Sequence, residues 1–485
     1  MIKINFLAIL LGGLLSAQTT FTLVKDINPG QSNSAPSNFM VFNNKMYFSA
    51  TYSPTGSVTG TELWESDGTE AGTRIVADIS PGLSSSSPTN LYNFGGRLYF
   101  IAALPVNGTN TSGVLMSYNN DEGLKTVSTT AKFASNFLIS NNKLYFKATN
   151  STVTPNTQRL YTLDDSLQPV IVDDNVNVMF VGNVGQQIIA NGQYKTATNP
   201  TWYQLFSMNT NTLDLLKTIN PSGTAYPQNF YYSPALGKSF FSANGGNGQE
   251  LWMSDGTVTG TIEVKDINTA TATAGSGVAN FTEYNGKIYF SASDGATSGA
   301  ELWVTDGTEQ GTKMLKDILP GSTGSFPEKL VVFKNKLYFL LNNSGGVRQL
   351  WESDGTESGT KLLSSLPAAF GLAMYNDNLY VSARVNASDQ IGVELYKVNL
   401  PDETLAINNI STSKVNVYPN PSKGAIIISN MTSGTFELLD TTGRLIKAGN
   451  FENSKVDLNS KAGNYILKVT SKDKKTHASN KVIIQ

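Results

Sequence analysis

Residues 62–73 read ELWESDGTEAGT, and the same pattern, ELWxxDGTxxGT, returns three more times in this chain of 485 residues. The further copies occupy 250–261, 301–312 and, with Gln349 in place of the glutamate, 349–360. A pattern that recurs within one chain indicates a repeat architecture, in which each copy is a small unit that packs on its neighbours. The sequence therefore predicts how the protein is built before any single residue indicates what it binds.

Each full copy contains four strand-like runs separated by turn residues. In the first copy the runs occupy 37–42, 45–50, 61–66 and 73–79. Asn43-Asn44 separates the first two runs and Asp67-Gly68 the last two, and both pairs are typical of tight hairpin turns. Each repeat is therefore predicted to be one four-stranded antiparallel sheet.

A bulky residue in the third run marks every copy. The marking residues are Trp64, Met116, Tyr161, Phe206, Trp252, Trp303, Trp351 and Tyr396. They lie 45 to 52 residues apart, so we expect eight copies, although only four keep the full signature. Four strands with this period are typical of the blades of a β-propeller.

The two ends of the array predict that it closes on itself. The eighth copy stops after its third run, at 393–398, and the chain begins with an unpaired run, FTLVKDI at 21–27, which is similar to the closing run of the sixth copy at 312–318. A linear stack of sheets would leave two bare edges. We therefore predict an all-β fold in which residues 18–400 form an eight-bladed β-propeller, with seven or nine blades, or a linear stack, as alternatives.

The composition excludes several kinds of chemistry. The chain has no cysteine, so disulfides and thiolate sites are excluded, and its one histidine, His477, lies near the C-terminus. A Ser-His-Asp mechanism and a histidine-based zinc site would lack their usual residue. Carboxylates, Tyr, Lys and Arg are left as catalytic groups.

The first 17 residues are predicted to be a signal peptide. They contain one cation, Lys3, an apolar run at 6–15, and the small residues Ser16 and Ala17. The alternative is a membrane anchor, but this run is shorter than the roughly 20 residues that span a bilayer. No later segment is apolar enough to span one, so we expect no transmembrane segment.

After Pro401 the period is lost, and we interpret residues 401–413 as a linker to a second domain, 414–485. Strand-like runs in it predict a small Ig-like β-sandwich; they occupy 425–429, 435–440, 444–447, 455–458, 464–470 and 481–484. Residues 413–485 hold 11 Lys or Arg and 5 Asp or Glu, a balance of +6, whereas 18–412 hold 23 and 32, a balance of −9. An acidic propeller argues against nucleic acid as a partner.

Three groups of residues in the last domain occur in a distinctive order. They are Tyr418, Pro419, Asn420, Pro421 and Gly424; then 438–440 with 442–444, including Gly443; then Leu458 with 463–465, beginning at Gly463. In this order they resemble the type A C-terminal sorting domain of the type IX secretion system. The resemblance implies a transport tag that is read by the type IX machinery after Sec export and is removed or exchanged by a sortase-like peptidase. It implies a secreted or surface-attached protein.

The repeated part resembles the ELWxxDGT repeat family of secreted bacterial proteins across nearly all of residues 20–400. Copies two to four, roughly 91–219, keep only the strand pattern. The resemblance implies a propeller-like fold and brings no established activity.

We interpret the repeated Asp-Gly turns as structural. The residues concerned are Asp67, Gly68, Asp255, Gly256, Asp306, Gly307, Asp354 and Gly355. The aspartate can accept hydrogen bonds from amides of its own turn, and the glycine can take a positive φ. Calcium is the alternative, but one carboxylate for each turn is too few for six to eight oxygen ligands, so we expect no cofactor.

Other repeated residues are also assigned to structure. The repeat tryptophans should pack between blades, the alternative being a ring of platforms on which sugars stack. The aspartates that end the fourth strands (Asp26, Asp78, Asp266 and Asp317) should cap the turns that follow. Trp202 and Tyr203 lie outside the repeat phase, so we take them as candidate ligand contacts. We predict a non-enzymatic binding or adhesion protein for an extracellular carbohydrate or protein; the alternative is a polysaccharide hydrolase or lyase that uses carboxylates or tyrosine.

Overall fold

The computed structural model describes residues 18–485 except 54–59, 82–83, 107–108, 153–156, 196–201, 296, 343–347, 389, 402–414, 416, 441–443 and 473–476. The predicted signal peptide, 1–17, and all of the predicted linker except Pro401 lie outside the described residues. Contacts divide the chain into two compact units: one is Gln18–Pro401, and the other holds the C-terminal strands. The described residues contain no helix long and apolar enough to cross a membrane.

The described strands of the first unit form eight four-stranded antiparallel sheets, numbered here in chain order. Sheet 1 contains β2 (Ser37–Phe42), β3 (Lys45–Tyr52), β4 (Gly60–Ser66) and β5 (Arg74–Ala77); sheet 2 contains β6 (Thr89–Phe94), β7 (Arg97–Val106), β8 (Thr109–Asn119) and β9 (Gly123–Ser128); sheet 3 contains β10 (Ala131–Ser140), β11 (Lys143–Asn150), β12 (Thr157–Leu163) and β13 (Pro169–Ile171); sheet 4 contains β14 (Val176–Val184), β15 (Gln187–Tyr194), β16 (Gln204–Asn209) and β17 (Thr212–Lys217).

The second half of this unit follows the same plan. Sheet 5 contains β18 (Gln228–Ser233), β19 (Lys238–Asn244), β20 (Gln249–Ser254) and β21 (Ile262–Lys265); sheet 6 contains β22 (Ala279–Tyr284), β23 (Lys287–Ala292), β24 (Glu301–Thr305) and β25 (Lys313–Lys316); sheet 7 contains β26 (Pro327–Phe333), β27 (Lys336–Asn342), β28 (Arg348–Ser353) and β29 (Lys361–Leu366); sheet 8 contains β30 (Ala368–Tyr375), β31 (Asn378–Arg384), β32 (Glu394–Asn399) and β1 (Thr20–Lys25).

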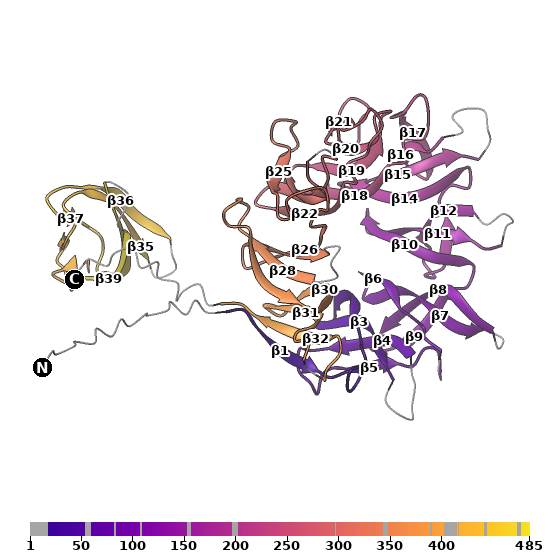
Figure 1. The fold of residues 1–485 in the computed structure, drawn as a ribbon, viewed down its shortest axis with the longest axis horizontal. Coiled ribbons are helices and arrows are strands. Elements are labelled where there is room, and N and C mark those ends of the chain that lie inside the picture. The colour runs from indigo at the N-terminus through magenta and orange to yellow at the C-terminus, as the bar shows by residue number, and fades with distance from the viewer. Residues whose placement is uncertain are drawn as a thin grey trace, which may run out of the picture. The chain divides into compact units, whose positions relative to one another are not determined.

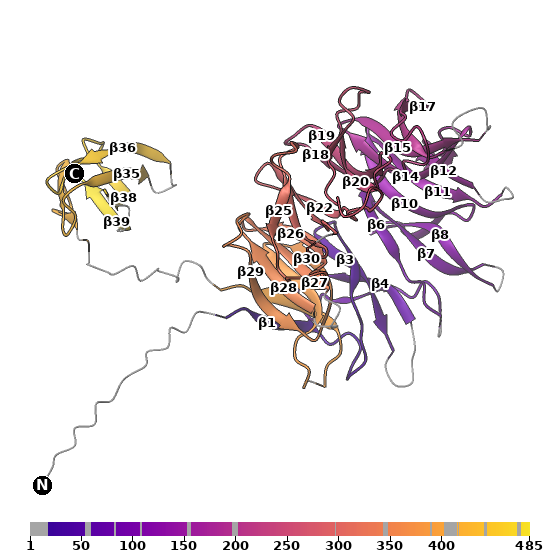
Figure 2. The same cartoon turned by 45° about the horizontal axis from the view of Figure 1, so that its top comes forward.

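The eight sheets follow one another around a common centre (Figure 1). The first strand of each sheet, which we call its inner strand, contacts the inner strand of the next sheet, and β30 of sheet 8 contacts β2 of sheet 1. The N-terminal strand β1 pairs with β32 (Figure 1), with Phe21 opposite Val398 and Leu23 opposite Tyr396. Figure 2 shows β1 from a second side. The prediction that the N-terminal run completes the sheet of the last repeat is therefore confirmed.

A hydrophobic cluster fills each junction between neighbouring sheets. Between sheets 5 and 6, for example, Phe240 and Met253 of one sheet pack with Phe290 and Trp303 of the other. Trp64 and Trp303 are 4% and 6% exposed, which confirms that repeat tryptophans pack between sheets. Because each fully buried side chain of this size contributes about 2–3 kcal/mol, the junctions are the main source of stability.

A lysine at the end of some fourth strands binds the Asp-Gly-Thr turn (the DGT turn) of the next sheet. The Nζ atoms and the carbonyl oxygens that they reach are Lys25 and Thr73 at 2.9 Å, Lys217 and Thr261 at 2.6 Å, Lys265 and Thr312 at 3.0 Å, and Lys316 and Glu357 at 3.2 Å. The same strand position, opposite the leucine of the third strand, holds Ala77, Ser128 and Ser364 in sheets 1, 2 and 7, and no DGT turn follows those sheets. The lysine and the turn are therefore two halves of one contact between sheets.

The second unit contains two sheets that share one hydrophobic core. One sheet has the order β33 (Val417–Tyr418), β34 (Ala425–Ile428), β37 (Lys455–Asp457), and the other has the order β36 (Leu445–Phe451), β35 (Gly434–Asp440), β38 (Gly463–Ser471), β39 (His477–Ile484). Ile426 and Val456 of the first sheet pack in one cluster with Phe436, Leu438 and Leu467 of the second. Each sheet thus buries one face against the other.

The lysine contact generates a prediction about stability. Lys265→Met removes the charged donor to the Thr312 carbonyl, and we expect the free energy of unfolding to fall by about 1–2 kcal/mol. The measurement is urea unfolding of the full chain. Lys313→Met, at an exposed lysine of the next strand, is the control and should change stability by less than about 0.5 kcal/mol. Equal losses in the two variants would contradict the role of the contact.

Candidate functional site

The strands of the first unit end on two sides. On one, the turn side, each inner strand turns into the second strand and, in sheets 1 to 7, the third strand turns into the fourth. On the other, the loop side, second strands continue into third strands, and each sheet connects to the next. The DGT turns lie on the turn side, and Trp202 and Tyr203, between β15 and β16, lie on the loop side.

The aspartate of each DGT turn accepts hydrogen bonds from the threonine of the same turn. The Oδ1 atom of Asp67 accepts from the backbone N–H of Thr69 at 2.9 Å and from its hydroxyl at 2.6 Å, and the same pair of bonds is found at Asp255, Asp306 and Asp354. The threonine hydroxyl, followed by the amide, holds the pKa of each aspartate below its usual value. Within the described residues, no group of three or more His, Cys, Asp or Glu side chains is placed to hold a metal ion.

Glycine is required in these turns for two reasons. Gly68 has a φ of 87°, and a Cβ there would lie 2.4 Å from the hydroxyl oxygen of Tyr380 in sheet 8. A Cβ on Gly72 would lie 2.0 Å from the Asp67 carboxylate. Gly256, Gly307 and Gly355 also have a φ of 89°. The turn is therefore compact and closely packed against the preceding sheet.

The glutamate of the ELW motif has a role that the sequence analysis missed. Glu62, Glu250, Glu301 and Glu394 are completely buried at the start of their third strands. Glu301, for example, accepts from the backbone N–H of Ile318 at 2.9 Å and of Ser325 at 2.8 Å. Each carboxylate thus fixes the loop that leads to the next sheet. The signal was present in the sequence, because glutamate begins three of the four full copies of the motif and also the ELY run at 394–396.

These glutamates have the role that the sequence analysis assigned to the aspartates at the ends of the fourth strands. The backbone N–H groups of Ile27 and Asn28, which follow Asp26, donate to Glu394 at 2.9 and 3.4 Å. The Oδ1 atoms of Asp26 and Asp266 are buried and accept no hydrogen bond. In sheets 5 and 8 the loop after the fourth strand is therefore held by a buried glutamate rather than capped by the aspartate that ends the strand.

Burial raises the pKa of all four glutamates, because the charged form loses its contact with water. The largest effect is at Glu394, where burial raises the pKa to about 7 in spite of hydrogen bonds from Ser34 and the backbone. Ser34 donates from its backbone N–H and its hydroxyl to this carboxylate. Glu394, which begins β32 of sheet 8, therefore holds the segment that leads from β1 to sheet 1.

Sheets 3 and 4 hold the same loops with other side chains. In sheet 4, Gln204 accepts from the N–H of Ile219 at 2.9 Å and donates to the carbonyl of Asn220 at 2.8 Å. In sheet 3 the position is Arg159, which is 1% exposed and donates from Nε to Asp174 at 3.0 Å. Sheets 3 and 4 therefore keep the loop contact although they lack the motif, whereas Val114 holds the position in sheet 2.

Aromatic residues hold one equivalent position on the loop side of three sheets. Phe133, Tyr226 and Phe326 each lie seven residues before the last residue of their inner strand, and their φ angles are 55°, 49° and 50°. Ala35 and Ser87 hold the same position with φ angles of 44° and 47°. The left-handed conformation therefore belongs to the repeat, whereas the aromatic side chain does not.

An aromatic residue at this position carries a conformational cost. A left-handed conformation costs a residue with a Cβ about 1–2 kcal/mol, and Gly277 takes the position in sheet 6 without that cost. Phe133 and Phe326 are 51% and 46% exposed, so burial does not explain them. An exposed aromatic side chain in a strained conformation marks this surface as a candidate for ligand contact.

Of the two predicted contact residues, Tyr203 lies beside Tyr226, and Trp202 precedes it in the chain. The rings of Tyr203 and Tyr226 lie 5.9 Å apart at 81°, and the ring of Tyr226 lies 5.7 Å from that of Phe180. The backbone carbonyl of Tyr203 accepts from the N–H of Tyr226 at 3.3 Å. Trp202 is 38% exposed. We call Phe133, Trp202, Tyr203, Tyr226 and Phe326 the loop-side aromatic residues.

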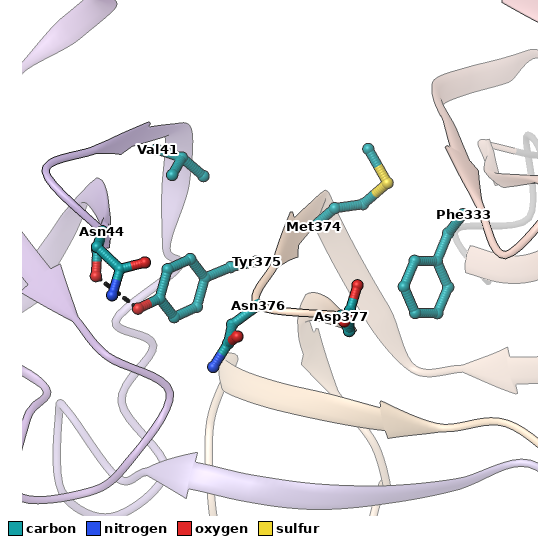
Figure 3. A pocket seen from close by; sticks show the side chains of 7 residues that line it. All are labelled: Val41, Asn44, Phe333, Met374, Tyr375, Asn376 and Asp377. Atoms are coloured by element: carbon teal, nitrogen blue, oxygen red, sulfur yellow. Dashed lines mark hydrogen bonds between the residues drawn. The ribbon is translucent and has the colours of Figure 1, made fainter.

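A shallow pocket of about 300 Å³ lies on the turn side, where sheets 7, 8 and 1 meet (Figure 3). Its lining residues are Val41, Asn44, Phe333, Met374, Tyr375, Asn376 and Asp377. The Tyr375 hydroxyl donates to the Asn44 carbonyl at 2.6 Å, which ties sheet 8 to sheet 1. Val41 and Met374 are 44% and 40% exposed. The pocket is thus a second, mainly apolar surface, far along the strands from the loop side.

The sorting motif lies in the second unit and covers the edge of its last strand. Asn420 donates from Nδ2 to the carbonyl of Lys481 at 2.7 Å, and its Oδ1 accepts from the N–H of Ile483 at 2.8 Å. It stands between Pro419 and Pro421, which have no backbone N–H to give to a strand. The amide side chain of Asn420 therefore pairs with β39 as a backbone would.

The remaining residues of the motif surround this segment. Tyr418 ends β33, Gly463 begins β38, and Gly424 has a φ of 117° and donates its N–H to the Ser422 hydroxyl at 3.1 Å. Gly443 lies outside the described residues.

Comparisons with known proteins identify the second unit. Residues 416–485 match the family described as "Secretion system C-terminal sorting domain". The chain therefore carries the sorting domain of type IX secretion, which directs it to the cell surface or the extracellular space and implies an interaction with the type IX machinery. A search of curated proteins finds no match to this sequence.

Solved structures similar to this chain include a peptidase, a component of a secretion system and one domain of a protease. A prolyl endopeptidase is 12% identical over 72% of this chain and 54% of its own, with a TM-score of 0.46, so this chain spans about half its length. PorZ, described as a surface component of the type IX secretion system of Porphyromonas gingivalis, is 13% identical over 96% of this chain and 70% of its own, with a TM-score of 0.38. The β-propeller domain of the Trilobed protease from Pyrococcus furiosus is 12% identical over 69% and 98%, with a TM-score of 0.42.

The raised pKa of Glu394 predicts how stability depends on pH. The folded state holds this proton up to about pH 7, whereas the unfolded state releases it near pH 4.5, so the free energy of unfolding falls as pH rises through this window. Glu394→Gln does not titrate there and should remove up to about 3 kcal/mol of that fall. Gln204 already fills the equivalent position in sheet 4.

The measurement is urea unfolding at pH 5, 6, 7 and 8. The control is Glu309→Gln, at an exposed residue of a DGT turn, which should keep the wild-type profile. A Glu394→Gln profile as steep as that of the wild type would show that Glu394 does not carry the effect.

Proposed function

We propose that this protein is a non-enzymatic binding or adhesion protein of the bacterial surface, exported by type IX secretion. Sheets 1–8 are then the blades of an eight-bladed β-propeller of ELWxxDGT-type repeats, and residues 414–485 are a small Ig-like β-sandwich that acts as the transport tag. The ligand is an extracellular carbohydrate or protein, and it binds the loop-side aromatic residues.

One observation carries this proposal. Phe133 and Phe326 are about half exposed and occupy a left-handed position that Ala35, Ser87 and Gly277 fill elsewhere. The ring of Phe133 packs over Gly113 of sheet 2, but about half of each phenylalanine side chain stays exposed. Contact with a ligand supplies the missing reason, because flat apolar rings bind the faces of sugar rings and the apolar side chains of proteins.

The geometry of the carboxyl groups favours binding over hydrolysis. A glycoside hydrolase needs two accessible carboxyl groups within about 5–10 Å of each other. The four third-strand glutamates are fully buried, each in a different sheet, and each is hydrogen-bonded to a loop of the scaffold. Burial also raises the pKa of the half-buried Glu263, which accepts a hydrogen bond from the Asn247 amide at 2.9 Å. Their raised pKa values thus have a structural cause.

The test is a binding screen with the full chain. The probes are a panel of immobilised polysaccharides, with mucin and collagen as protein probes, and both retention and released product are scored. For the probe that retains the wild type, Phe133→Ala and Trp202→Ala should each weaken retention about tenfold or more, because exposed rings that contact a ligand typically contribute 1–2 kcal/mol or more. Val258→Ala, at a 56% exposed residue on the turn side, is the matched control.

Each other outcome has a definite meaning. Release of oligosaccharide would overturn the non-enzymatic role. Unchanged retention in both aromatic variants, together with loss in Met374→Ala, would place the ligand in the turn-side pocket and overturn the loop-side assignment.

A further inference from the structure

The two sheets of the sorting domain have four edges, and three of them are closed or short. The edge strands of the smaller sheet, β33 and β37, have two and three residues. The edge of β39 is covered by the segment after Pro419: Asn420 pairs through its side chain, and Ser422 donates its N–H to the Ile483 carbonyl at 2.8 Å. Short strands and covered edges are the usual ways in which proteins prevent strand addition.

The fourth edge, β36, differs from the others. It has seven residues, pairs with β35 on one side, and pairs with no described strand on the other. Leu445 and Ile446 at its start are 55% and 38% exposed. A long edge strand with exposed apolar residues is a template for pairing with another chain.

The cations near this edge do not protect it. Lys447 donates from Nζ to the carbonyl of Asp457 at 3.0 Å, which directs its charge towards the domain. Arg444 forms an ion pair with Asp440, with Nε 3.1 Å from the carboxylate. Charged side chains on an edge strand commonly block the addition of another strand. Lys447 and Arg444 are instead bound to other groups of the domain, so their charges do not block the edge of β36.

We propose that β36 is the surface by which this domain docks on the type IX secretion machinery, through addition of a strand from an outer-membrane component of that machinery. The partner class follows from the match of residues 416–485 to a sorting domain. Pairing along a strand edge is made by backbone hydrogen bonds, which a receptor can form with strands of different sequence. Leu445 and Ile446 add an apolar contact beside the paired strands.

The test uses the full chain in a bacterium that has type IX secretion. Ile446→Lys should reduce the fraction of the chain outside the cell or exposed to added protease at least fivefold. The matched control is Ile427→Lys: Ile427 is 42% exposed but lies in β34, whose two edges are already paired with β33 and β37. It should be secreted within twofold of the wild type.

A photo-crosslinking residue at position 446 identifies what pairs with the edge. The expected adduct joins this chain to an outer-membrane protein of the secretion machinery, and the same residue at position 427 should give none. Thermal unfolding of the purified variants checks that both remain folded. Wild-type secretion of Ile446→Lys, equal loss in the two variants, or an adduct only with a second copy of this chain would each overturn the proposal.

Discussion

Each sheet of the ring is apolar on both of its faces, and the rest of the structure depends on this constraint. Along β3, Met46 and Phe48 pack against sheet 8, whereas Tyr47, between them, packs against sheet 2. A sheet of this kind is unstable alone in water, because it needs a neighbour on each side. The array is complete only when the last sheet meets the first, and β1 contributes Val24 to that final junction.

Polar contacts add direction to this packing. Hydrophobic contact is not directional, so by itself it leaves the rotation of one sheet on the next weakly specified. The lysines that reach the DGT turns and the glutamates that hold the connecting loops each join a side chain of the scaffold to backbone groups of a turn or loop. Buried backbone groups must be hydrogen-bonded, so these contacts also satisfy loops that would otherwise be costly to bury.

The irregular sheets have a different pattern of residues. Sheets 2 to 4 lack the DGT turn, and sheets 3 and 4 replace the buried glutamate by Arg159 and Gln204. Phe133, Trp202 and Tyr203 belong to these same sheets or to the loops between their strands. Positions that do not take part in the DGT turn or the glutamate contact can hold different residues from one sheet to the next. In these sheets they include exposed aromatic side chains on the loop side.

The sequence by itself determined the strand pattern, the period and the pairing of the N-terminal run with the last repeat. These follow from local alternation, turn residues and internal similarity, which need no knowledge of distant contacts. The tertiary structure decided the roles of single residues. Glu394 reaches Ser34 across 360 residues of chain, and Phe133 is unusual only because its position, conformation and exposure are compared with those of Ala35 in another sheet. Such roles depend on which segments the closed ring brings together, and that is not a property of any local stretch of sequence.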